Sequence, residues 1–110
     1  MANTFKNSIT GSIGTTETTI YTTPASTTST VIGVSVANVV ASNINVGVKL
    51  YDADLATSVY LLSGSLLPAG SNVVLVGGDQ KVVLETGDYL TLVSNTATSA
   101  DAVVSVLEIS

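Results

Sequence analysis

The stretch TVIGVSVANVVASNINVGVKL, residues 30–50, indicates the fold class of this chain more clearly than any other segment. From Ile44 to Leu50, apolar residues alternate with polar residues and glycine, which is the period-two pattern of a strand with one buried face. From Thr30 to Val40 the same alternation places small residues together on one face. A face of that kind indicates close contact with a neighbouring subunit or a covering loop. The turn residues 41–43 lie between the two runs, so we expect a hairpin.

Similar short runs fill the rest of the chain, separated by turns that contain Gly, Pro or Asp about every 8–12 residues. We expect a second hairpin to join 81–85 to 89–94 through Thr86, Gly87 and Asp88. With about eight strands, the chain is predicted to be all-β, a single antiparallel β-sandwich with either jelly-roll or immunoglobulin-like strand order. The remaining strands are expected at residues 5–13, 15–23, 59–62, 72–76 and 101–109, with turns at 67–70 and 77–79.

The length of 110 residues predicts one domain, residues 1–110, which buries roughly two-thirds of the surface of its unfolded chain. Two interpretations of its beginning stay open. The Thr-rich N-terminal quarter forms two edge strands, or residues 1–4 form an extended arm that adds to the sheet of a neighbour. Terminal segments are mobile unless they are tied down, and this is the reason for considering the arm.

The composition predicts a protein partner. Hydrophobic residues make up 45% of the chain and charged residues 10%, against about 25% in an average soluble domain. We therefore expect a homo-oligomer or a component docked on a larger assembly; the alternative is a monomer coated with Ser and Thr. A net charge of −5 repels phosphate backbones, so no nucleic-acid partner is expected. No signal-peptide pattern and no apolar run of bilayer length are visible, so we expect synthesis in the cytoplasm and no membrane.

The residue types argue against catalysis. The chain has no His, Cys, Trp or Arg, so a Ser or Thr nucleophile would depend on one of three lysines as its base. Acidic pairs are the other route to general acid–base chemistry, but aspartates beside Gly in turns are explained by capping of their own backbone. We expect no enzyme and no cofactor. The acidic residues weighed for this role are Asp52, Asp54, Asp79, Glu85, Asp88 and Asp101.

Two weaker ligand hypotheses remain. Asp52 and Asp54, at i and i+2 of an extended segment, project to one side and form a weak Ca²⁺ candidate, with an ordinary solvated loop as the alternative. Four tyrosines and Phe5 are the only aromatic residues. We expect them in the core or in an interface, with a polar sugar-binding loop as the alternative.

Three motifs carry a family resemblance: LPAG at 67–70, LETGDYL at 84–90 and the terminal DAVVSVLEIS. With them, the chain resembles small β-rich virion structural proteins of tailed bacteriophages, notably of cyanobacterial and marine hosts. The resemblance implies a capsid decoration, or cement, protein on the virion surface, bound to the major capsid protein as a trimer or dimer. A neck, tail or fibre protein in host attachment or carbohydrate binding is the alternative. The interface candidates are Phe5, Ile9, Ile32, Gly33, Val34, Ser35 and Val36.

Overall fold

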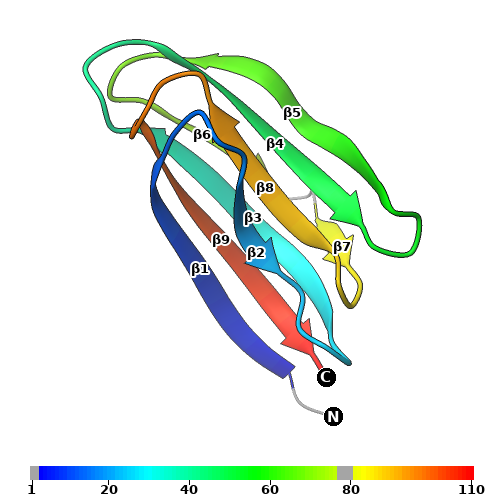
Figure 1. Ribbon diagram of the computed structural model, residues 1–110. Coiled ribbons are helices and arrows are strands. Elements are labelled where there is room, and N and C mark those ends of the chain that lie inside the picture. Colours follow the sequence, from blue (N-terminus) through cyan, green and yellow to red (C-terminus); the bar gives the residue numbers. More distant parts are fainter. Residues whose placement is uncertain (1–2, 77–80) are drawn as a thin grey trace.

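The computed structural model describes residues 3–76 and 81–110, and all of their regular structure is β-strand. Figure 1 shows long strands laid side by side in two layers, with turns gathered at both ends. The strands are β1 (Asn3–Ile13), β2 (Thr18–Thr22), β3 (Thr28–Asn38), β4 (Ile44–Asp52), β5 (Thr57–Leu67), β6 (Asn72–Val76), β7 (Val82–Leu84), β8 (Tyr89–Ser94) and β9 (Ala100–Ile109).

The strand order identifies a jelly roll. One layer, here called sheet A, has the order β1-β9-β3-β6, and β7 also pairs with β3; the other, sheet B, has the order β2-β8-β4-β5. Because β6 pairs with the second half of β3 and β7 with the first half, these two short strands share one position. The antiparallel pairs β1–β9, β2–β8, β3–β6/β7 and β4–β5 are nested, as in a jelly roll of two Greek keys. The predicted sandwich is confirmed, and the immunoglobulin-like order is excluded.

The core lies between the sheets and is filled by β-branched residues and leucine. Alternate positions of β9 illustrate the pattern, since Ala102, Val104 and Val106 are buried while Val103 faces outward. Each fully buried Val, Ile or Leu contributes about 1.5–3 kcal/mol relative to an exposed one. The largest fully buried side chains are Ile13, Ile20, Val31, Val34, Val36, Ile44, Val46, Val48, Leu84, Leu90 and Leu92.

Both predicted hairpins are wrong. β3 and β4 lie in different sheets, so residues 39–43 carry the chain from sheet A to sheet B instead of turning it back. The same holds for β7 and β8, which pair with β3 and with β2 and β4. Alternation tells which face of a strand is buried but not which strand lies beside it, and short polar turns suit a crossover equally well. The strand at 72–76 is confirmed, and the turn predicted at 77–79 lies outside the described residues.

The side chain of Asn38 makes hydrogen bonds that connect several segments at the end of the sandwich where the chain crosses between the sheets. Its side chain is buried, and Nδ2 donates to the carbonyl oxygens of Ser42, Leu67 and Pro68 at 2.8, 3.0 and 3.1 Å. Its Oδ1 accepts the amide of Val40 at 2.9 Å. One amide therefore ties the end of β3 to the end of β5 and to the crossover between β3 and β4. Nothing in the sequence pattern marked this residue.

The N-terminal residues that the structure describes belong to the sandwich. Asn3 and Thr4 pair with Ile109 and Glu108 of β9, so they are part of β1 and not of a free arm. Met1 and Ala2, the rest of the predicted arm, lie outside the described residues. A register shift interrupts the β1–β9 pairing after Thr10. No helix in the described part of the chain is long and apolar enough to cross a membrane.

Candidate functional site

The outer face of sheet A exposes apolar side chains in two rows that run across the strands. The paired positions Ile9, Val103, Ser35 and Val74 form one row. Phe5, Leu107, Thr30 and Val83 form the other. Five of these side chains are exposed, and we call this surface the apolar face. Their exposed fractions are 74% for Phe5, 73% for Ile9, 61% for Val74, 59% for Val83 and 42% for Val103.

A third row, with no charged and no large apolar side chain, separates the two apolar rows. It consists of Asn7, Ser105 and Gly33, which are paired across β1, β9 and β3. A shallow depression of about 300 Å³ lies here. The surface is thus ridged by apolar residues and free of charge in all three rows, which suits contact with another protein surface. The depression is lined by Phe5, Lys6, Asn7, Ile32, Ser105 and Val106.

The predicted interface residues divide between this face and the core. Phe5 and Ile9 lie on the face, and Ile32, Gly33 and Ser35 are half-buried there or at its depression. The choice of Val34 and Val36 was wrong, because both are buried between the sheets. The prediction took the consecutive residues 32–36, and successive residues of a strand point to opposite faces, so it included core positions. A register shift between Val31 and Gly33 also puts Ile32 out of phase with those two valines. Sequence reasoning missed Val74, Val83 and Val103, although apolar residues at both parities of the last strand signalled a second apolar face.

The outer face of sheet B is different, because its aromatic and charged side chains contact one another. Tyr51 and Tyr89 stack with ring centroids 4.7 Å apart. Lys49 Nζ lies 5.0 Å from the centroid of the Tyr60 ring and 3.3 Å from Glu17 Oε1. These rings therefore pack on their own neighbours. Of the four tyrosines, all within the described residues, Tyr21 alone lies in the core.

A buried polar group joins the two sheets near the C-terminus. The Tyr21 hydroxyl, on β2, donates to Glu108 Oε2 on β9 at 2.6 Å and lies 2.7 Å from Ser29 Oγ on β3, which donates to it in turn. Lys6 Nζ lies 3.2 Å from Glu108 Oε1. Burial of the hydroxyl, with Glu108 beside it, raises the pKa of Tyr21 from 10.0 to about 12. The hydrogen bond from Tyr21, with help from Lys6, lowers the pKa of Glu108 although burial acts in the opposite direction.

These shifts predict how stability changes with pH. A lowered pKa in the folded state makes Glu108 stabilising above its ordinary pKa of 4.5, and this contribution is lost as pH falls through the lowered value. A raised pKa makes neutral Tyr21 stabilising below pH 10, and this is lost as pH rises towards 12. Tyr21→Phe removes the titration of Tyr21 and the largest cause of the lowered pKa of Glu108, while the contribution of Lys6 remains. We expect the substitution to cost about 1–3 kcal/mol near neutral pH and less at both extremes. Urea unfolding across the pH range checks this; parallel profiles for the two proteins would contradict it.

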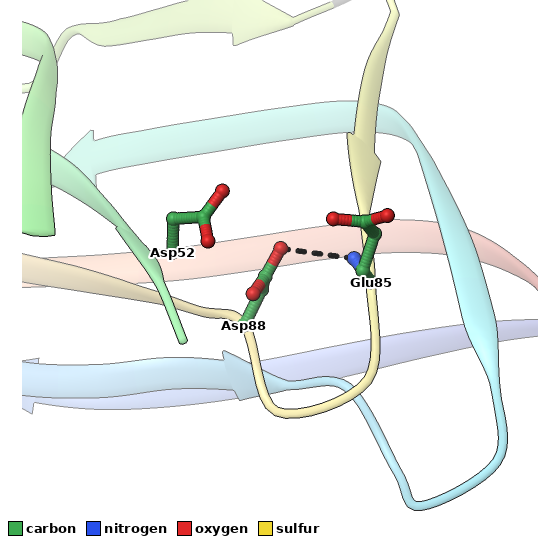
Figure 2. Close-up of side chains that lie close together, drawn as sticks. All are labelled: Asp52, Glu85 and Asp88. Carbon is green, nitrogen blue, oxygen red and sulfur yellow. Dashed lines mark hydrogen bonds between the residues drawn. The ribbon is translucent and has the colours of Figure 1, made fainter. Parts of the chain in front are cut away.

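Three carboxylates lie close together at the end of β4 and in the segment between β7 and β8 (Figure 2). Ligand atoms of Asp52, Glu85 and Asp88 lie within 4.8 Å of one another. Asp54, the predicted calcium partner of Asp52, is exposed in the turn after β4, where its amide donates to Asp52 Oδ1 at 2.9 Å. Asp52, Glu85 and Asp88 are therefore the group that could hold a cation, although Ca²⁺ needs 6 to 8 oxygen ligands. The role that the structure shows is capping of the backbone: Asp88 accepts hydrogen bonds from the amides of Ala53 and Glu85 at 2.9 and 3.0 Å.

Asp88→Asn tests this capping role. Asp88 is 3% exposed and both of its oxygens accept amides, whereas an asparagine offers one acceptor, so one buried N–H loses its partner. We expect a loss of about 1–3 kcal/mol in thermal unfolding. The stability gained when repulsion from Glu85 is relieved is smaller than this loss, because Glu85 is exposed and water screens its charge. The control Asp54→Asn makes the same change at an exposed turn residue and should stay within about 0.5 kcal/mol. If Asp88→Asn is as stable as Asp54→Asn, the relief of repulsion between the carboxylates is as large as the loss of the capping hydrogen bond, and the prediction is wrong.

Comparisons with known proteins give one similarity, and it concerns the fold. No protein-family model matches the sequence, and no curated protein matches it. Among solved structures, the chain is similar to a protein of the Bacillus endospore appendages, described as a novel family of disulfide-linked pili. The TM-score is 0.58 over 98% of this chain and 88% of that chain, at 12% sequence identity. The present sequence contains no cysteine, so it cannot form disulfide links. The resemblance to phage virion proteins stays a prediction.

Proposed function

We propose that this chain is a non-enzymatic structural subunit that docks on a larger protein assembly through its apolar face. The observation that carries the proposal is the exposure of Phe5, Ile9, Val74, Val83 and Val103 on one side of one sheet. Several exposed apolar side chains on one face of a small soluble domain mark a protein contact. The three rows of this face contain no charged residue; Lys6, which also lines the depression, is 55% exposed and paired with Glu108.

The assembly that we propose is a phage capsid shell, on which the chain acts as a decoration protein bound to the major capsid protein. Two observations support this choice: the sequence resemblance described above, and the jelly-roll topology, an architecture that viral capsid domains use. A decoration protein also needs no catalytic group. Repetition over many equivalent sites lets a modest contact per copy add up to a large stabilisation of the shell.

The number of copies per particle tests this proposal. Quantitative mass spectrometry of the purified virion should find tens to hundreds of copies, as expected for a chain repeated over an icosahedral shell. The purified protein should also bind empty shells. A few copies per particle, or binding to host cells and not to shells, would overturn the decoration role in favour of host attachment by a tail or fibre protein.

A second candidate is a subunit of a non-covalent filament. It is favoured by the similarity in fold to a pilus protein over nearly the whole chain. Electron microscopy of the purified protein alone separates the two candidates. Regular filaments would support this second function, while separate small particles that bind shells would support the first.

A further inference from the structure

Strand β1 is the exposed sheet edge that remains suited to pairing with another chain. Natural sheets protect their edges by short strands, bulges and inward charges. Here β2 has five residues and a register shift, β6 and β7 have five and three residues, and β5 pairs with β4 through two register shifts. By contrast, residues 3–10 of β1 pair with β9 in unbroken register, and Figure 1 shows β1 as the outermost strand of its layer. This regular segment is about 26 Å long.

The sequence of β1 is nearly symmetric about Asn7. Phe5 and Ile9 stand two residues to either side on the outer face, and Lys6 and Ser8 stand one residue to either side. In an antiparallel pair of two copies centred on Asn7, Phe5 of each copy lies opposite Ile9 of the other. Lys6 lies opposite Ser8, and the two Asn7 amides face each other. Aromatic and β-branched residues directly opposite each other stabilise antiparallel pairs, and such exchange of partners is what a two-fold interface requires.

We infer that two copies of this chain associate through β1 in this register, making one continuous sheet of two sheets A. The register joins the row ending in Phe5 of one copy to the row ending in Ile9 of the other, so both apolar rows continue across the dimer. Charge also allows it. The chain has a net charge of −5, but β1 contains no acidic residue. Its one charged residue, Lys6, lies opposite the buried Val106 and is therefore an inward charge of the kind that protects an edge, but its ammonium group is already paired with Glu108 at 3.2 Å.

Charges introduced at Asn7, on the two-fold axis, test the dimer. Asn7→Lys and Asn7→Asp each place like charges opposite each other, so each should raise the dissociation constant of the dimer at least about tenfold in sedimentation equilibrium. Mixing the two variants should restore wild-type association, because lysine then faces aspartate. The control Asn72→Lys makes the same change at an exposed residue of β6, the opposite edge, and should dimerise like the wild type.

Three results would overturn the inference: a wild-type protein that stays monomeric over the whole concentration series, equal association of Asn7→Lys and Asn72→Lys, or a mixture that fails to recover. Circular dichroism of each variant shows whether the chain remains folded. If Asn7→Lys unfolds the chain, the same comparison is made with Asn7→Gln, which lengthens the central side chain without charge and should weaken the dimer relative to Asn72→Gln. Binding to empty shells is measured separately, so the dimer and the proposed function can fail independently.

Discussion

Replacing Val74 and Val83 together with lysine is expected to abolish binding to empty capsid shells while leaving the chain folded. Both side chains are exposed in the free protein, at 61% and 59%, so their burial would occur on docking and not on folding. Each valine that becomes buried contributes about 1.5–3 kcal/mol. Loss of both contacts, and burial of unpaired ammonium groups, should weaken binding by a factor of at least about 100.

A matched control is available on the other sheet. Val59 and Leu66 of β5 are exposed to nearly the same extent, 57% and 60%, and the double lysine variant there adds the same charge. Co-sedimentation with shells should leave this control bound and the first variant free, while both melt near the wild-type temperature. If both variants bind equally well, or if the β5 variant is the one that loses binding, the apolar face is not the docking surface. Since Val74 and Val83 are remote from β1, this result does not depend on the inferred dimer.

Asn38→Asp is expected to destabilise the chain more than Tyr21→Phe or Asp88→Asn. The substitution replaces an NH₂ group that donates to three carbonyl oxygens by a carboxylate oxygen that repels all three. Asn38 is 4% exposed, so water cannot take over these hydrogen bonds. A buried acceptor facing acceptors, with several groups left unsatisfied, costs on the order of 3–5 kcal/mol. For a domain of this size, that lowers the melting temperature by roughly 12–40 °C.

Asn45→Asp and Asn72→Asp make the same chemical change at exposed positions and serve as controls. They should change stability by less than about 0.5 kcal/mol in chemical denaturation. Protonation of the carboxyl group introduced by Asn38→Asp would restore a donor, so the gap between this variant and its controls should narrow at acidic pH. A variant at 38 as stable as the controls at neutral pH would show that the three carbonyl contacts do not hold the crossover.

The class of fold followed from sequence, whereas the pairing of strands did not. Alternation in residues 44–50 identified a strand correctly because the period of two depends only on the strand's own side chains. The neighbours of β3 are β6, β7 and β9, which come some 40 to 80 residues later, and no local pattern specifies such partners. The jelly-roll order, and the failure of both predicted hairpins, are consequences of that non-local pairing.

Only part of the docking surface was predictable, because its residues come from strands that are far apart in the sequence. Phe5 and Ile9 lie on an edge strand whose other residues are mostly polar, so these two apolar side chains stand out in the sequence. A single register shift after Val31 moved Ile32 out of phase; Gly33, a glycine inside a strand pattern, was the one signal of a bulge there. Val74, Val83 and Val103 become one surface only when three separate strands are placed side by side.

Cryo-electron microscopy of the assembly that contains this chain would show whether the apolar face is the docking surface of a shell protein. We predict the jelly roll at regular positions on the outside of the capsid shell, with Phe5, Val74, Val83 and Val103 buried against a neighbouring protein. A chain found at a single vertex or on fibres, or docked with its apolar face open to solvent, would contradict the proposed role.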